Sequence, residues 1–225
     1  IGAAVLEGAR IPNTAAIVRD NRFHCERPSQ SRLVGDVPCK TCKWQCAPVD
    51  APQAVAERLN NLQKTREKRQ ASLNAFQKVV VTSHELKRHI APLLAPHQSM
   101  KRIPNTFGRI SQYSGLLDIT AQTANKKLLI IGMLNENKGQ FEFIDHSIDW
   151  LKARPDVTLT LCGRGQRMER QISELLRAHD LTSRVTLTGY LSRQEIFREI
   201  RESHLVLAPT RWAEPFGRVP LEAGI

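Results

Sequence analysis

The chain has 225 residues, of which 41% are hydrophobic and 24% charged. This composition is typical of a globular protein with one or two domains, and it excludes a largely disordered chain. No apolar run reaches the roughly 18 residues of a membrane-spanning helix. The first residue is Ile1 rather than methionine, so we expect the natural N-terminus to lie outside this sequence.

The net charge of +11 is concentrated in the first half of the chain. Residues 1–110 hold 18 Lys and Arg against 8 Asp and Glu, whereas residues 111–225 hold 15 against 14. A solvated basic face would explain this bias. So would an anionic partner such as nucleic acid, an anionic membrane surface or a phosphate-bearing acceptor.

The first half predicts a loosely organised region of strands and helices. Its expected elements are the end of a strand at 15–20, an amphipathic helix at 53–77, a buried strand at 78–83, a helix at 84–95 and a short strand at 101–105. Thr82 and Glu85 have the spacing of a helix N-cap pair. A polar stretch at 107–124 then marks a domain boundary.

Four of the five cysteines lie together: Cys25, Cys39, Cys42 and Cys46. The spacing C-x13-C-x2-C-x3-C permits a tetrahedral zinc site, but it lacks the two separated C-x2-C pairs of a strong zinc signature. Reduced thiols that hold a loop, and disulfides, remain alternatives. Cys162 is expected to be a buried thiol on a strand.

From residue 125 onward, strands and helices alternate regularly. Strands are expected at 126–134, 157–163, 184–190 and 204–210, and helices at 139–154, 168–179, 192–203 and 217–225. Ser192 and Glu195 form a capping box. Such alternation predicts parallel βαβ units with helices on both faces, in which ligands bind beyond the carboxyl ends of the strands.

Three of these strand ends carry polar or glycine-rich sequences. Lys138-Gly139 opens one helix, Gly163-Arg164-Gly165 follows the second strand, and Glu214 and Glu222 flank the start of the last helix. Taken singly, they fit a surface lysine, turn glycines and solvated glutamates. Together they suit one anionic ligand rich in hydroxyl groups, which predicts a sugar-nucleotide site.

The segment "EPFG" supplies two further candidate groups. The backbone N–H groups at Phe216 and Gly217 would face outward at a helix N-terminus, and Gly217 would allow a close approach of phosphate. Glu214 lies before that helix and Glu222 more than one turn inside it. Their carboxylates could therefore accept hydrogen bonds from different parts of one ligand.

The order of these motifs resembles a known family. The segments "RIPNTF", "IIGMLNENKGQF", "LTLCGRG", "VTLTGYLSRQEI" and "LVLAPTRWAEPFGRVPLEA" are similar to the donor-binding domain of retaining GT-B glycosyltransferases of family 4, the glycosyl transferases group 1 domain. Glu214 and Glu222 match the E-x7-E motif of that family. The resemblance spans roughly residues 78–225.

The resemblance implies an α/β fold of two Rossmann-like parallel-sheet domains, both truncated in this chain. A partial acceptor-side domain with the Cys-rich loop would occupy residues 1–107. Residues 108–124 would form a linker, and residues 125–225 a partial nucleotide-sugar donor domain. A chain truncated in this way is expected to be poorly stable and inactive when expressed alone.

The resemblance also implies roles for single residues. Lys138 and Glu214 would be catalytic, with Lys138 on the donor diphosphate and Glu214 near the transferred sugar. Glu222 would bind the ribose. The other residues that would line the nucleotide-sugar site are Gly132, Gly163, Phe216 and Gly217.

The implied reaction is transfer of a sugar, with retention, from a nucleotide sugar to a lipid-linked or saccharide acceptor. It would serve the synthesis of a cell-surface polysaccharide or glycolipid. No metal ion or cofactor is expected in this step, and zinc at the cysteine cluster remains an option. The expected location is cytoplasmic, with peripheral membrane contact as an option.

Two departures from the family pattern bear on activity. Many relatives have an arginine where Met133 stands, so Lys138 would act alone, or Arg218 or Arg164 would compensate. Many also have a histidine-aspartate pair where Arg19-Asp20 stands, and we therefore assign no catalytic histidine.

These departures keep a non-catalytic relative open as an alternative. Another alternative is a basic, Cys-rich module that binds nucleic acid or a nucleotide. An aromatic content of 5% and the lack of a recognised nucleic-acid-binding motif make a nucleic-acid partner unexpected.

Overall fold

The structure is a computed structural model that describes residues 14–19, 64, 67–105, 125–211, 214 and 216–224. Two compact units are present. The first comprises residues 1–106 and 212–216, and the second residues 107–211 and 217–225. The expected linker at 108–124 and the four clustered cysteines lie outside the described residues, so their assignments stay predictions.

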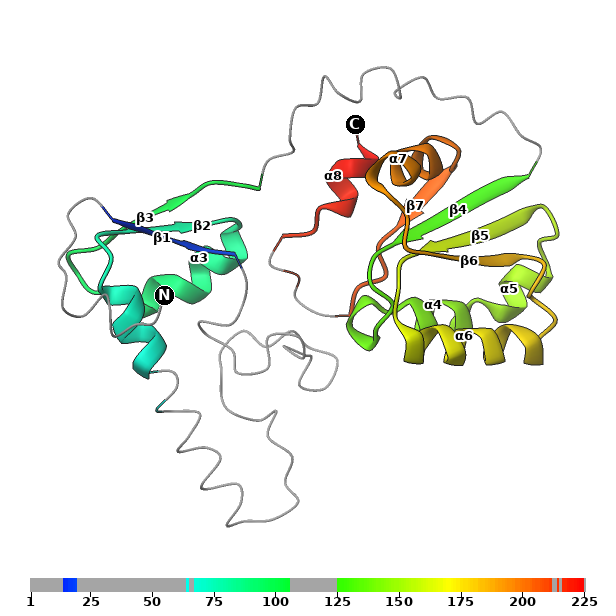
Figure 1. Ribbon diagram of the computed structural model, residues 1–225, viewed down its shortest axis with the longest axis horizontal. Coiled ribbons are helices and arrows are strands. Elements are labelled where there is room, and N and C mark those ends of the chain that lie inside the picture. The colour runs from blue at the N-terminus through cyan, green and yellow to red at the C-terminus, as the bar shows by residue number, and fades with distance from the viewer. Residues whose placement is uncertain are drawn as a thin grey trace, which may run out of the picture. The chain divides into compact units, whose positions relative to one another are not determined.

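The first unit contains a three-stranded parallel sheet (Figure 1). The strands are β1 (Ala15–Val18), β2 (Lys78–Val81) and β3 (Ser99–Arg102). β2 lies in the middle, with Val81 opposite Val18 on one side and Arg102 on the other. The expected strand at 101–105 therefore ends earlier, before Pro104, which has no N–H for a strand ladder.

Helices of the first unit are residues 67–74, α3 (His84–Ile90) and the 3-10 turn η3 (Ala91–Leu93). The N-cap of α3 is Ser83, whose hydroxyl accepts a hydrogen bond from Leu86 N at 3.1 Å. The prediction of Thr82 as the cap was wrong by one residue, because the Thr82 side chain is buried at the end of β2. These helices and β1 and β2 enclose a core of Val18, Leu73, Val79, Val81, Leu86, Ile90 and Leu93.

The second unit contains a four-stranded parallel sheet in the order β6-β5-β4-β7. Its strands are β4 (Lys126–Ile131), β5 (Val157–Cys162), β6 (Val185–Gly189) and β7 (Leu205–Leu207). β4 and β5 are continuous apolar runs with buried residues. This pattern is typical of parallel strands that are covered on both faces.

The helices of this unit are the 3-10 turn η6 (Glu136–Lys138), α4 (Gln140–His146), α5 (Ile148–Lys152), α6 (Gln166–Ala178), α7 (Arg193–Arg201) and α8 (Val219–Ala223). α4, α5 and α6 cover one face of the sheet and α7 the other (Figure 1). The single helix expected at 139–154 is two helices, because the backbone leaves helical geometry at Ser147 (φ −102°, ψ 3°).

The capping box at the start of α7 is confirmed. Ser192 Oγ accepts a hydrogen bond from Glu195 N, and the Glu195 carboxylate accepts one from Ser192 N at 2.6 Å. Lys127 joins α7 to β4, because its Nζ lies 2.8 Å from Glu199 Oε2 and 3.3 Å from Glu202 Oε2. Beneath the sheet, the core includes Ile130, Ile144, Leu151, Leu159, Leu161 and Ile172.

Candidate functional site

The strand order of the second unit places a switch point beside β4. From β4 the chain moves outward through β5 to β6, and it then returns to β7 on the other side of β4. In open parallel sheets, ligands bind at such a point, outside the carboxyl ends of the strands. A ligand site is therefore expected at the loops that follow β4 and β7.

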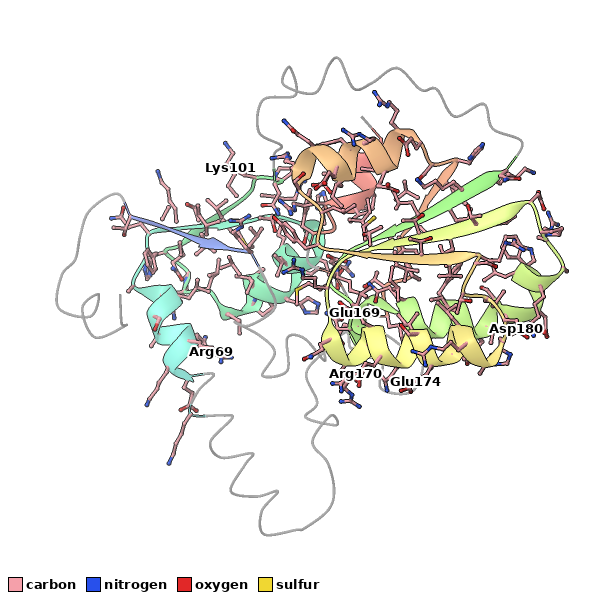
Figure 2. The ribbon with its side chains drawn as sticks, turned by 45° about the vertical axis from the view of Figure 1, so that its right-hand side comes forward. Arg69, Lys101, Glu169, Arg170, Glu174 and Asp180 are labelled. Carbon is pink, nitrogen blue, oxygen red and sulfur yellow. The ribbon has the colours of Figure 1, made fainter. Side chains whose placement is uncertain are left out.

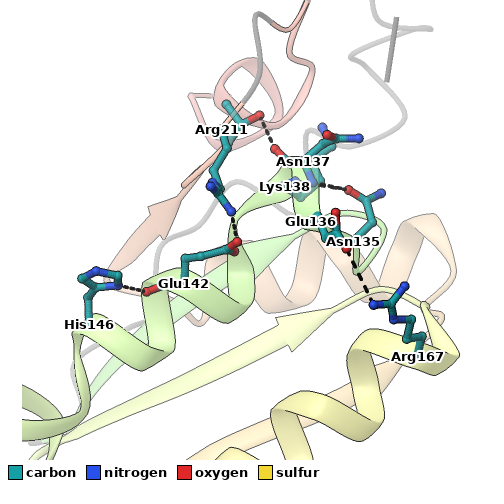
Figure 3. Close-up of polar contacts among 9 residues, drawn as sticks. Asn135, Glu136, Asn137, Lys138, Glu142, His146, Arg167 and Arg211 are labelled. Carbon is teal, nitrogen blue, oxygen red and sulfur yellow. Dashed lines mark hydrogen bonds and ion pairs between the residues drawn. The ribbon is translucent and has the colours of Figure 1, made fainter. Parts of the chain in front are cut away.

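The loop after β4 runs from Gly132 to Gly139, and its own side chains shape it. The Asn135 side chain caps η6, since its Oδ1 accepts hydrogen bonds from Asn137 N at 3.0 Å and Lys138 N at 3.2 Å (Figure 3). Gly139 then adopts a left-handed conformation with φ 68°, which ends η6 and starts α4. Lys138 is thereby held at the last position of a capped turn.

The side chain of Lys138 lies over Gly132. A Cβ atom on Gly132 would be 3.9 Å from both Lys138 Cδ and Lys138 Cε. These distances are ordinary van der Waals contacts, so the lysine stem packs over Gly132, where the backbone φ of 147° favours glycine. The structure brings together two residues that the sequence predicted for one site.

Gly163 and Gly165 allow the loops after β4 and β5 to lie in close contact. A Cβ on Gly163 would be 1.8 Å from Gly132 O, and one on Gly165 would be 1.9 Å from Leu134 O. Gly132 N donates to Cys162 O at 2.9 Å, and Gly163 N donates to Gly189 O at 2.8 Å. These glycines have a packing role in the described residues, and their contact with a ligand stays a prediction.

The loop after β7 is fastened to the loop after β4. Arg211 N donates to Asn137 O at 2.8 Å, and the Arg211 guanidinium pairs with the Glu142 carboxylate of α4 (Figure 3). A Cβ on Gly139 would be 2.1 Å from Pro209 O. The turn that carries Lys138 therefore rests directly on the segment that follows β7.

Gln140 is a site residue that the sequence did not reveal. It is 1% exposed at the start of α4, and its Nε2 donates to Met133 O at 3.0 Å. Its Oε1 is buried without a hydrogen-bond partner. A buried glutamine that fixes the Met133 carbonyl has the same sequence appearance as a solvated one, so only the three-dimensional packing identifies it.

The N-terminus of α6 is capped internally. Gly165 N donates to the carboxylate Oε1 of Glu169 at 2.8 Å, and Glu169 is labelled at the start of this helix in Figure 2. Arg167, also in the first turn, lies 4.0 Å from Glu136 Oε1 in η6 (Figure 3). Glu169 and Glu136 thus satisfy polar groups at this end of the sheet.

The remaining predicted residues are divided between the two units. Glu214 and Phe216 belong to the first unit, whereas Gly217 and Glu222 belong to the second. α8 begins at Val219, with Arg218 at its N-cap, so the helix starts later than expected. Glu222 N donates to Arg218 O, which places Glu222 in the first turn rather than beyond it.

Both departures from the family pattern lie at strand ends. Arg19 follows β1 in the first unit and is exposed. Met133 follows β4 in the second unit and is 69% exposed. Cys162 is confirmed as a buried free thiol at the end of β5, and burial raises the pKa of this thiol despite a hydrogen bond with Thr188.

Within the described ranges, no group of three or more His, Cys, Asp and Glu side chains could hold a metal ion. No helix in that part of the chain is both long and apolar enough to cross a bilayer.

Comparisons with known proteins agree with this architecture. Residues 118–224 match the family model described as Glycosyl transferases group 1. Glycogen synthase of Mycobacterium tuberculosis (strain ATCC 25618 / H37Rv) is 28% identical over 102 residues, which are 45% of this chain and 24% of that protein. The matched part therefore spans about a quarter of the curated relative.

Solved structures show the same fold. HepE of Anabaena, in complex with UDP and glucose, is 23% identical with a TM-score of 0.56, over 72% of this chain and 45% of that one. The pneumococcal O-GlcNAc transferase GtfA, in complex with UDP and GlcNAc, is 16% identical with a TM-score of 0.60, over 99% and 38%.

The predicted fold class is confirmed: the protein is α/β with parallel sheets, and its structural neighbours are GT-B glycosyltransferases. The family model and the sheet topology agree on the same part of the chain. The residues that match the glycosyl transferases group 1 model, 118–224, fall mostly within the second unit.

Proposed function

We propose that the protein is a glycosyltransferase that transfers a sugar, with retention, from a uridine-diphosphate sugar to an acceptor. The observation that carries the proposal is the position of Lys138, whose side chain crosses Gly132 at the switch point of the sheet. An ammonium group there is placed to bind a diphosphate. The bound UDP of HepE and GtfA supports uridine as the base.

The role proposed for Lys138 is electrostatic. When the bond between the sugar and the diphosphate breaks, negative charge grows on the leaving diphosphate, and a fixed cation stabilises that charge. Asn135 and Gly139 hold the lysine in a capped turn, so little reorganisation is needed at the moment of transfer. Glu222 and the Phe216–Gly217 backbone would bind ribose and phosphate, and Glu214 would contact the transferred sugar.

The proposal is tested by UDP and UDP-glucose binding to the full chain, measured by calorimetry. We expect Lys138→Ala to weaken UDP binding by about tenfold or more, because it removes a charge-assisted contact. Lys152→Ala, at the exposed end of α5, is the matched control and should bind like the wild type. If no nucleotide sugar binds the wild type, and Glu222→Ala changes nothing, the enzymatic proposal is overturned.

Retention is tested separately on the product. With an α-linked donor, NMR of the new glycosidic bond should find the α configuration. A β-linked product would reject retention but leave sugar transfer in place.

The acceptor proposal rests on the positive charge of the first half of the chain. Residues 1–110 contain 18 Lys and Arg but only 8 Asp and Glu. We propose an acceptor that carries phosphate or lies at an anionic membrane surface, in the cytoplasm. Sedimentation with vesicles of phosphatidylglycerol, against phosphatidylcholine as the control, measures this preference. Equal binding to both would assign the charge to a solvated face.

A further inference from the structure

The peptide group that joins Asn137 to Lys138 is held at both of its polar atoms. Its N–H donates to Asn135, with 3.2 Å to the side-chain Oδ1 and 3.1 Å to the backbone oxygen. Its carbonyl accepts hydrogen bonds from Arg211 N at 2.8 Å and from Thr210 Oγ1 at 3.2 Å. Because a peptide group is planar, these contacts fix its orientation and the direction in which the Lys138 side chain leaves the backbone.

The segment 209–211, which follows β7, makes two more contacts with the same part of the chain. The carbonyl oxygen of its first residue would lie 2.1 Å from a Cβ at Gly139. The Arg211 guanidinium pairs with the carboxylate of Glu142 in the first turn of α4 (Figure 3). The segment therefore contacts the residues before and after Lys138 and also the helix that follows.

The ion pair between Arg211 and Glu142 is partly shielded from solvent. The two side chains are 46% and 30% exposed, respectively. The other ion pair at this turn is looser, since Arg167 lies 4.0 Å from Glu136 and these side chains are 80% and 53% exposed. A pair that is partly buried is screened less by salt than a pair in open solvent. Arg211 is therefore the arginine that fastens the turn more firmly.

Loss of Arg211 would leave Glu142 in an unfavourable state. Its second carboxylate oxygen, Oε2, is buried and has no hydrogen-bond partner among the described residues. A partly buried carboxylate without its cation carries a desolvation cost that nothing offsets. The segment 209–211 and α4 would then separate to let water reach the carboxylate, and the contacts with the Asn137 carbonyl would loosen.

We propose that Arg211 is a positioning residue of the diphosphate site, which holds the Lys138 turn in place through its ion pair with Glu142. The inference rests on the proposed function and deepens it, because Arg211 acts through Lys138 rather than on the ligand. Electrostatic stabilisation of a leaving group depends on charges that are already in place and need no reorganisation. The ion pair supplies this order from outside the loop after β4.

Binding of UDP and uridine to the full chain, measured by calorimetry, tests this role. Arg211→Met should weaken UDP binding by about fivefold and change uridine binding by less than about twofold, because uridine lacks the diphosphate. Arg170→Met, at an exposed arginine of α6 (Figure 2), is the control and should bind UDP like the wild type. If Lys138→Ala weakens UDP binding but Arg211→Met does not, the role of Arg211 alone is overturned.

A double-mutant cycle distinguishes positioning from a separate contribution of Arg211. If Arg211 acts through Lys138, Arg211→Met should cause no further loss of UDP affinity in the Lys138→Ala background. A further loss of about fivefold in that background would contradict the positioning role.

Glu142→Gln breaks the ion pair from its acidic side. We expect it to weaken UDP binding by about as much as Arg211→Met, even though it removes a negative charge. A direct contact of Arg211 with phosphate predicts the opposite sign, because a free guanidinium would attract UDP more strongly. Tighter or unchanged UDP binding by this variant would therefore contradict the proposal.

Circular dichroism melts verify that each variant is folded at the temperature of the binding experiment. If Arg211→Met does not fold, Glu142→Gln alone and in the Lys138→Ala background provides the same test, because it retains the shape of the side chain. Absence of UDP binding by the wild type would instead overturn the proposed function itself, so the two failures are distinguishable.

Discussion

The two units end their central strands in different ways. In the first unit, β2 passes into α3 within two residues, and Ser83 caps the helix directly. In the second unit, β4 is followed by eight residues before α4 begins, and these contain η6, Gly132 and Gly139. Where a helix begins two residues after its strand, as α3 does, the connection holds few polar side chains. The longer loop after β4 has room for Lys138 at the carboxyl end of the sheet.

Glycine content follows the same division. In the described first unit, none of the three strand ends is followed by glycine within two residues. Glycine follows β4 and β5 in the second unit, and it is the last residue of β6. The loops of the second unit approach one another so closely that a Cβ cannot fit at Gly163 or Gly165. The shape of the candidate site therefore depends on close backbone contacts between these loops rather than on side-chain packing.

The largest expected effect comes from Gly163→Ala. The new Cβ would meet Gly132 O at 1.8 Å, and the backbone φ of 156° is unfavourable for alanine. We expect a loss of about 4 kcal/mol or more in the free energy of unfolding, measured by urea denaturation.

Gly189→Ala is the control for this substitution. Gly189 has φ 70°, but no atom lies within 4 Å of an added Cβ. Only the backbone cost applies, which is about 1–2 kcal/mol. Equal losses for the two variants would contradict the close approach of the loops after β4 and β5.

The next effect concerns Gln140, which joins α4 to the loop after β4. Gln140→Glu removes the donor to Met133 O and places a carboxylate at a position with 1% exposure, so we expect a loss of about 3 kcal/mol. Gln140→Leu also removes the donor, but it eliminates the unpartnered Oε1, and its loss should be about 1 kcal/mol. Chemical denaturation of both variants measures the difference. A larger loss for Leu than for Glu would contradict the burial of this side chain.

A smaller effect concerns Lys127, which links α7 to the sheet. Burial lowers its pKa, but hydrogen bonds and charges from Glu199 and Glu202 outweigh burial and raise the pKa above the ordinary value. The contribution to stability is complete below the unfolded pKa of about 10.4, and it disappears as pH rises through the folded value. Lys127→Met should cost about 1 kcal/mol at pH 7 and less above pH about 10.4.

Thermal unfolding at pH 7 and pH 11 checks this behaviour. The Tm difference between wild type and Lys127→Met should narrow at the higher pH, because wild-type Lys127 loses its charge there. The exposed Lys152→Met is the control, for which the difference should stay small at both values. A gap that widens at pH 11 would contradict the ion-pair role.

The smallest expected losses of stability come from removing the helix N-caps, one in each unit. Ser83→Ala and Ser192→Ala each remove an N-cap hydroxyl and should each cost about 1 kcal/mol. At α7 the hydrogen bonds from Ser192 lower the pKa of Glu195. The stabilisation from this carboxylate is present above its unfolded pKa and is lost as pH falls through the folded value.

Circular dichroism melts at pH 7 and pH 3 compare the two caps. Between pH 7 and pH 3, the loss of Tm caused by Ser192→Ala should shrink more than the loss caused by Ser83→Ala. The reason is that Ser192 is hydrogen-bonded to the Glu195 carboxylate in a capping box. An equal pH dependence in the two variants would contradict the coupling of Ser192 and Glu195.

Sequence patterns located most strands and helices correctly, since buried parallel strands are short apolar runs and the helices show apolar residues at helical spacing. The break at Ser147 was missed because apolar residues continue the helical spacing across it. The Ser83 cap was displaced by one residue, because Thr82 and Ser83 are both good caps in sequence and only burial of Thr82 distinguishes them.

The amino-acid sequence alone determined the alternation of elements, the parallel class of the sheets and the family motif order, because these depend on local spacing and composition. Only the tertiary structure decided that Lys138 crosses Gly132, that Gln140 is buried against Met133, and that Arg211 is held by Glu142. The reason is physical: register, strand order and burial arise between residues far apart in the chain, and no local pattern encodes them.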